Sequence, residues 1–132
     1  MYESLTKYID KIDDDIICKL VEEPGYMPYV DYTSMVDDFV DDVYKFLKES
    51  KEVSPKNYRD IINANGIDLN TKSVFEVDPN TLDGSCVFSI LLAAVRAERF
   101  SDGVLENLFK QGHIKRWLER LKAIDEKNNL NK

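Results

Sequence analysis

Residues 82–125, LDGSCVFSILLAAVRAERFSDGVLENLFKQGHIKRWLERLKAID, decide the fold class of this chain. Within them, the run 86–95 contains a single polar residue, Ser89. A helix that is apolar nearly all round is normally buried on most of its surface. The pattern therefore predicts a central buried helix over about 84–100, a break at 101–103, a short helix, and a final helix that begins near Gly112.

Two arginines, Arg96 and Arg99, follow the apolar run directly and are expected to start near the core. A guanidinium cannot lose its proton and presents five donors, so a buried one must meet carboxylates or carbonyls. We interpret the arginines as an internal ion-pair network that fixes the packing of the last helices. The alternative is a pocket for an anionic ligand or a partner's carboxylate. Both interpretations use the same predicted cluster of Arg96, Glu98, Arg99, Asp102 and His113.

Helical periodicity extends through most of the remaining chain. The spacing predicts a first helix over about 2–21, whose apolar face is Leu5, Ile9, Ile12, Ile16 and Leu20. A second helix is predicted over 34–49, where Ser34 and Asp37 resemble a capping box with Asp in place of Glu. A short third helix opens at Ser54 and Pro55 and stops at Gly66.

The connections complete a single-domain prediction. Two prolines and a glycine break the chain at 22–28, and residues 67–83 are expected to be an extended connection anchored by Val74, Phe75 or Val77. The sequence predicts one all-α domain over residues 1–132, with five or six helices around the 84–100 helix. The polar residues 126–132 are expected to fray.

Cysteine usage and hydropathy limit the class of protein. Cys18 and Cys86 belong to no CxxC pattern or Cys/His cluster, so both are interpreted as small core side chains. No apolar run approaches the roughly 20 residues that span a bilayer, and the first residues lack a basic and then apolar signal pattern. We therefore expect a cytoplasmic protein that does not bind membranes.

Charge is divided unevenly along the chain. Residues 1–66 hold 15 acids and 8 bases, a net charge of −7, whereas residues 67–132 hold 10 of each. From residue 113 onward there are 6 bases against 3 acids, a net charge of +3. An acidic front half repels phosphate, which argues against direct nucleic-acid binding and favours a protein partner with a basic surface. The same asymmetry leaves head-to-tail pairing in a homodimer as an alternative.

An acidic face and an aromatic loop form the predicted interaction surface. Four aspartates make two pairs at a spacing of four, so each pair shares a face of the second helix: Asp37, Asp38, Asp41 and Asp42. The loop that precedes them carries Tyr26, Tyr29 and Tyr32, which either fold back onto the core or add to the binding surface.

No recognisable chemistry accompanies these residues. One helix cannot surround a cation with enough oxygens, and the chain lacks an EF-hand pattern, so we expect no metal and no cofactor. His113 is the only histidine and has no Ser or Cys nucleophile in a recognisable motif. A non-enzymatic protein is therefore favoured over an enzyme.

Two segments resemble a known family. The strings VRAERFSDGVL at 95–105 and GHIKRWLERL at 112–121 are similar to the C-terminal signature of a domain-of-unknown-function family of small bacterial and phage-borne proteins. The segment YRDIINANG at 58–66 is similar to the part that precedes it. The resemblance covers about the last 75 residues. It implies an α-helical fold and carries no assigned activity, so no catalytic residue follows from it.

Three functional hypotheses follow. The leading one is a protein-interaction or regulatory module that acts through the acidic face and the aromatic loop. The second is a protein or enzyme that binds a small anionic ligand at the arginine cluster. The third is an acidic inhibitor that occupies the nucleic-acid site of a basic protein, for which a net charge of −7 is modest.

Overall fold

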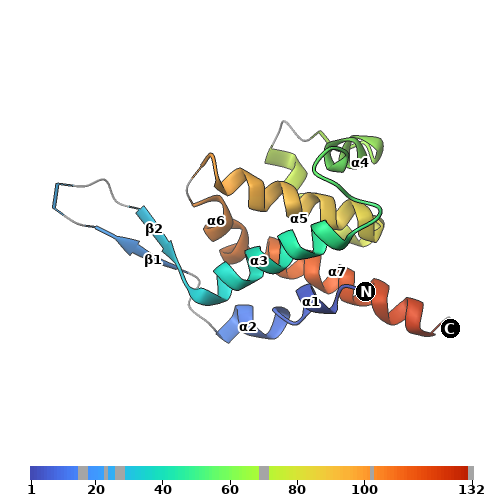
Figure 1. Cartoon of the computed structure of the whole chain (residues 1–132), viewed down its shortest axis with the longest axis horizontal. Coiled ribbons are helices and arrows are strands. Elements are labelled where there is room, and N and C mark those ends of the chain that lie inside the picture. The colour runs from blue at the N-terminus through green and yellow to red at the C-terminus, as the bar shows by residue number, and fades with distance from the viewer. Residues whose placement is uncertain (15–17, 23, 26–28, 69–71, 102, 131–132) are drawn as a thin grey trace.

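A buried helix, α5 (Gly84–Glu98), runs through the middle of the protein (Figure 1). The computed structural model describes residues 1–14, 18–22, 24–25, 29–68, 72–101 and 103–130. Every α5 side chain from Cys86 to Val95 is buried, Ser89 included, and the Ser89 hydroxyl donates to the Ser85 carbonyl at 2.7 Å. The predicted central helix is confirmed, although it ends at Glu98 rather than Phe100.

Four further helices pack around α5. They are α3 (Ser34–Glu49), α4 (Tyr58–Ala64), α6 (Val104–Lys110) and α7 (His113–Leu130). Rings fill the space between them, for example Phe46 of α3 and Phe88 of α5, whose centroids lie 4.7 Å apart. The predicted all-α fold in one compact domain is confirmed.

The first 32 residues differ from the single helix predicted over 2–21. The chain forms two short helices, α1 (Glu3–Thr6) and α2 (Ile9–Asp14), and then two antiparallel strands, β1 (Cys18–Val21) and β2 (Tyr29–Tyr32). In the register, Cys18 lies opposite Tyr32 and Val21 opposite Tyr29. Figure 1 shows the strands extending away from the helical body. The continuous N-terminal helix was therefore a wrong prediction.

Local composition explains the strands. β2 reads Tyr-Val-Asp-Tyr, and β-branched and aromatic residues favour extended backbone. Between the strands, Gly25 has a φ of +85°, in the left-handed region that glycine adopts most readily. Strand pairing of 18–21 with 29–32 thus replaces the helical turns that the spacing of Ile16 and Leu20 had indicated.

The observed helix boundaries agree only in part with the predicted ones. The bounds of α3 are those predicted, but its N-cap residue is Thr33, and Ser34 is already helical, so the proposed capping box was wrong. The helix predicted from Ser54 begins at Tyr58, whose N–H donates to the Ser54 carbonyl at 3.1 Å. The tail expected to fray continues α7 as far as Leu130.

The connection predicted over 67–83 contains two short 3₁₀ helices, at Lys72–Phe75 and Pro79–Thr81. Val74 is buried, and Phe75 and Val77 pack partly buried against the core, as the anchoring prediction required.

Neighbouring segments hold the N-terminal end of α5 in place. The Asp83 side chain accepts from the Cys86 N–H at 2.9 Å, which caps the helix. Arg120 of α7 donates from Nε and Nη2 to the Leu82 carbonyl at 3.0 and 2.9 Å. A Cβ on Gly84 would lie 2.9 Å from Cζ of Tyr2, so only glycine lets the Tyr2 ring approach this closely.

The start of the chain is also bonded to the last helix, α7. The Tyr2 N–H donates to Oδ2 of Asp125 at 2.7 Å, and Asp125 is only 8% exposed. The Tyr2 ring stacks on Phe46 with centroids 5.2 Å apart. The first turn of the chain is therefore fixed against both α3 and α7.

Two other findings bear on function. Within the described residues, no helix combines the length and the apolar content needed to cross a membrane. Cys86 is a free, buried thiol, and burial raises its pKa to about 11, so it is not a reactive nucleophile at neutral pH. The Cys18 side chain lies outside the described residues.

Candidate functional site

Four of the five residues of the predicted cluster line different hollows near the C-terminal end of α5 and the start of α7. Glu98 and Arg99 line a groove against α3, whereas Arg96 lines a hollow against α4. His113 lines a third hollow beside Glu76 and Gln111. Asp102 lies outside the described residues. The structure thus divides the four described residues of the predicted cluster among three surfaces.

Neither arginine is buried as the sequence had suggested. Arg96 is half-buried and Arg99 is exposed, because α5 emerges from the core in its last turn. The Cζ atom of Arg96 lies 5.5 Å from the centroid of the Tyr58 ring, and that of Arg99 lies 5.0 Å from the Tyr44 ring. Among the described residues, no carboxylate forms an ion pair with either guanidinium. In the described part of the chain, each guanidinium therefore stacks on a tyrosine, while Asp102 of the expected ion-pair network lies outside that part.

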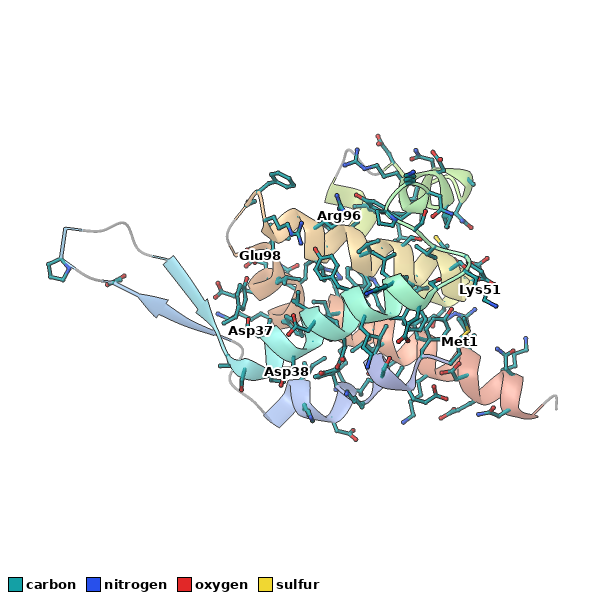
Figure 2. The ribbon with its side chains drawn as sticks, in the orientation of Figure 1. Met1, Asp37, Asp38, Lys51, Arg96 and Glu98 are labelled. Carbon is teal, nitrogen blue, oxygen red and sulfur yellow. The ribbon has the colours of Figure 1, made fainter. Side chains whose placement is uncertain are left out.

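Glu98 has a clear architectural role. Its carboxylate accepts from the N–H of Gly103 at 2.8 Å and from the N–H of Leu105 at 3.0 Å, at the start of α6. A carboxylate at a helix N-terminus satisfies unpaired donors and interacts favourably with the helix dipole. Figure 2 shows Arg96 and Glu98 near the C-terminal end of α5, where the chain turns toward α6. Glu98 therefore joins α5 to α6.

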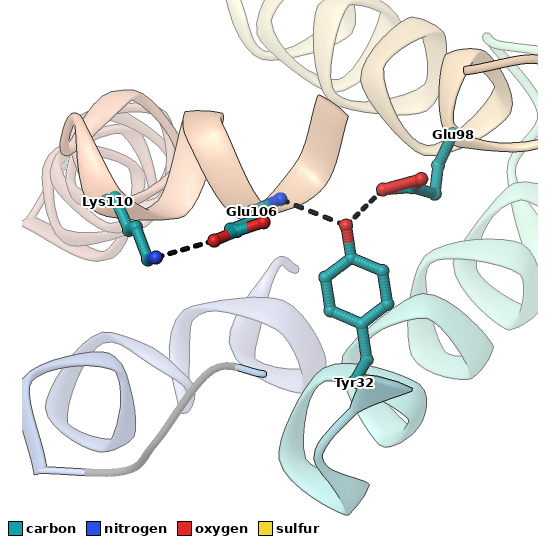
Figure 3. A network of polar contacts seen from close by, with 4 residues as sticks. All are labelled: Tyr32, Glu98, Glu106 and Lys110. Carbon is teal, nitrogen blue, oxygen red and sulfur yellow. Dashed lines mark hydrogen bonds and ion pairs between the residues drawn. The ribbon is translucent and has the colours of Figure 1, made fainter. Parts of the chain in front are cut away.

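Tyr32 extends this junction to the strands. Its hydroxyl donates to Glu98 and accepts from the Glu106 N–H at 3.0 Å (Figure 3). On the next turn of α6, the Glu106 carboxylate pairs with Lys110 Nζ at 2.5 Å. Of the three loop tyrosines in the predicted surface, Tyr32 folds back onto the body of the protein, while Tyr26 and the Tyr29 side chain lie outside the described residues.

The four aspartates of α3 fall on two faces of the helix, as their spacing of four residues predicted. Asp37 and Asp41 are exposed and line the groove next to Glu98 and Arg99. Asp38 is exposed but does not line it. Asp42 accepts from the Tyr8 hydroxyl at 2.5 Å and pairs with Lys7 Nζ at 3.2 Å. Asp42 thus connects α3 to the N-terminal helices.

Electrostatics support the structural role of Asp42. Burial raises the pKa of its carboxyl, but hydrogen bonds from Tyr8 and Lys7 outweigh burial, so the pKa lies below its ordinary value. The charged form of Asp42 is therefore the one that the fold stabilises.

The groove that contains Asp37 and Asp41 has a volume of about 480 Å³. It lies between α3 and the C-terminal end of α5, with the start of α6 and the end of β2 along its sides. Its apolar lining comes from Val36, Val40, Val95 and Leu105. Tyr44 also lines it, and the buried Tyr44 hydroxyl has no hydrogen-bond partner among the described residues.

Sequence reasoning identified two of the aspartates in this groove but missed the residues beside them. Val40 and Tyr44 lie three and seven positions after Asp37, so all three share one helix face with Asp41. Reading that face as a unit would have placed Tyr44 beside the aspartates. The hollow around Arg96 is lined by further residues that were not predicted as site residues, among them Tyr58, Arg59 and Phe100.

His113 contacts nearby residues of the same chain segment. Its Nδ1 contacts Arg116, its Nε2 lies 3.1 Å from the Gln111 side-chain oxygen, and its ring stacks on Trp117. Burial and the nearby Arg116 charge lower the pKa of His113. Among the described residues, no group of three or more His, Cys, Asp or Glu side chains could hold a metal ion.

Comparison with known proteins places this fold in a family. No curated protein and no solved structure matches the chain. One family model matches residues 3–127, a span that includes the strands, the groove and the hollow around Arg96. Because the match covers nearly the whole chain, the protein belongs to the family of unknown function DUF6508.

Proposed function

We propose that this protein is a non-enzymatic interaction module whose groove between α3 and α5 binds a basic segment of a partner protein. The observation that carries the proposal is the pair Asp37 and Asp41 on the rim of an apolar groove. No described residue forms an ion pair with either aspartate. Two adjacent carboxylates above an apolar floor suit a lysine or arginine next to an apolar side chain.

Arg99 adds a requirement on the partner. It lines the same groove and stacks on Tyr44 without an ion pair to any described carboxylate. A segment that presents its basic side chain to α3 should therefore present a carbonyl or carboxylate to Arg99. This arrangement of opposite charges would fix the direction in which the segment binds.

The size of the groove limits the mode of binding. A volume of about 480 Å³ holds one or two side chains and not a folded domain. The partner would therefore contribute a short segment, and affinity would come from one apolar anchor with charge pairs at the rim. Rim pairs exposed to solvent contribute about 0.2–1 kcal/mol each. We thus propose a reversible contact of moderate affinity.

Selection of peptides tests this proposal. A phage-displayed library of random dodecapeptides would be selected on the immobilised protein, and enriched peptides would be labelled with fluorescein and titrated by anisotropy. We expect enriched peptides to carry Lys or Arg beside an apolar residue. The double variant Asp37→Asn and Asp41→Asn should weaken their binding about tenfold at low salt.

The chain offers a matched control. Asp10 and Asp38 are also exposed and do not line the groove, so the double variant Asp10→Asn and Asp38→Asn changes the net charge equally. It should leave peptide binding nearly unchanged. Enrichment of peptides without basic residues, or an equal loss of affinity in both double variants, would contradict the proposal.

A further inference from the structure

A second surface lies on the other side of α5, between α5 and α4. We call it the Arg-Tyr-Phe patch and define it as Tyr58, Arg59, Arg96 and Phe100. These residues line a hollow of about 320 Å³ whose floor includes Phe75 and Ala93. The patch shares no residue with the groove proposed above.

The guanidinium groups of Arg59 and Arg96 both lie close to the buried ring of Tyr58. Tyr58 is only 4% exposed, and its ring centroid lies 5.8 Å from Cζ of Arg59 and 5.5 Å from Cζ of Arg96. Arg59 Nε also donates to the Tyr58 hydroxyl at 3.2 Å. Among the described residues, neither arginine forms an ion pair. The ring therefore positions two positive charges without neutralising them.

Phe100 completes the patch with an exposed apolar group. Its side chain is 88% exposed, and Met1 is the only other exposed large hydrophobic residue among those the structure describes. A single exposed phenylalanine would need no explanation. Here it lines the same hollow as both arginines, and Arg, Tyr and Phe are enriched in the centres of protein interfaces.

We propose that the Arg-Tyr-Phe patch binds an acidic segment of a protein partner, in which carboxylates flank an apolar side chain. The carboxylates would accept from Arg59 and Arg96, while the apolar side chain packs against Phe100. A long polyanion such as nucleic acid fits less well, because the chain carries a net charge of −7 and the patch offers two arginines.

This inference goes beyond the proposed function, because it assigns a second partner of opposite charge to a second face. A protein that binds a basic segment in its groove and an acidic segment on its patch would link two partners. The turn of α5 between Arg96 and Arg99 separates the two faces.

The test is an NMR titration of the ¹⁵N-labelled protein with a probe peptide, acetyl-EELFEE-amide. We expect saturable shifts of the backbone amides of Tyr58, Arg96, Ala97 and Phe100. The glutamine analogue, acetyl-QQLFQQ-amide, should bind at least about fivefold more weakly, since it lacks the charges that the arginines recognise.

Variants of exposed residues keep the test independent of folding. Phe100→Ser should weaken binding of the probe about tenfold, and Arg59→Gln about two- to fivefold. Arg116→Gln is the matched control, because Arg116 is exposed on α7 and does not line this hollow. It should leave binding unchanged.

Three results would overturn the proposal. They are shifts dispersed over other surfaces, equal binding of the glutamine analogue, and the same shifts produced by sodium phosphate at the same concentration. The double variant Asp37→Asn and Asp41→Asn should bind the probe as the wild type does. A failure of the patch is thus distinguishable from a failure of the groove.

Discussion

The two ends of α5 are held in different ways. At the N-terminal end, Asp83 caps the helix, Arg120 bonds to the Leu82 carbonyl, and the Tyr2 ring lies against Gly84. At the C-terminal end, Arg96 is half-buried, and Arg99 and Phe100 are exposed. The first end is covered by neighbouring segments, whereas the second presents its side chains to two surfaces. One helix thus contributes both to the core and to the two surfaces proposed to bind partners.

The difference follows from composition. The run from Cys86 to Val95 is apolar except for Ser89 and is buried throughout, so its burial favours folding. Arg96 and Arg99 come at the C-terminal end, where positive charge interacts favourably with the helix dipole. Changes at the two ends should therefore affect stability unequally.

Two phenylalanines of this segment give the largest expected contrast. Phe88→Ala removes a side chain with 0% exposure that packs on Phe46, and it should lower the free energy of unfolding by about 3–5 kcal/mol. Phe100→Ala should change it by less than about 0.5 kcal/mol. Urea denaturation followed by circular dichroism measures both. Similar losses in the two variants would remove the contrast between the ends.

Replacing the carboxylates that accept hydrogen bonds at the two ends of α5 should give the second-largest change in the free energy of unfolding. Glu98→Ala removes the acceptor for the N–H groups of Gly103 and Leu105, and should cost about 1.5–3 kcal/mol. Asp83→Ala removes one cap and should cost about 0.5–2 kcal/mol. Hydrogen exchange should also speed up in α6 for the Glu98 variant alone. If α6 exchanges as slowly as in the wild type, Glu98 does not join the two helices.

Replacing either arginine should lower the free energy of unfolding by a smaller amount. Because Arg96 and Arg99 stack on tyrosines, we expect Arg96→Ala and Arg99→Ala each to cost about 0.5–1 kcal/mol. A broken buried ion pair would cost about 3–5 kcal/mol instead. Denaturant unfolding distinguishes these ranges. A loss in the larger range would restore the ion-pair interpretation made from the sequence.

The smallest expected effect is the pH dependence of stability that arises from His113, near the turn after α5. His113 lines a hollow with Ser101 and Gly103, and burial, with Arg116, lowers its pKa below 6.5. Between the lower pKa of the folded state and 6.5, the unfolded chain binds more protons, so stability should fall slightly as pH drops through this range. His113→Gln should flatten the dependence between pH 7.5 and 5.5. An unchanged slope would mean that another group titrates there.

Local periodicity was enough to predict α3 and most of α5, because each is one long segment with a consistent apolar face. The prediction of one N-terminal helix was wrong for a physical reason. The spacing of apolar residues in 2–21 suits a helix, but residues 18–21 pair with 29–32, and that choice depends on a partner strand that periodicity does not reveal.

Prediction of the candidate site from the sequence was limited in the same way. The spacing of Asp37 and Asp41 predicted their shared face, and both line the groove. The tyrosines that hold the arginines could not be predicted, since Tyr44 and Arg99 come from helices far apart in the chain. Burial of the arginines was inferred from the residues before them. The last turn of α5 leaves the core, so that inference did not extend to Arg99.

The contact between Tyr2 and Asp125 has a consequence for synthesis of the chain. A ribosome makes the Tyr2 end first and Asp125 only near the end of the described chain, 123 residues later. Until then, the Tyr2 ring can pack against Phe46 of α3 and Gly84 of α5, but the Tyr2 N–H lacks its acceptor in α7. The first turn of the nascent protein therefore gains its full set of contacts only after α7 has emerged.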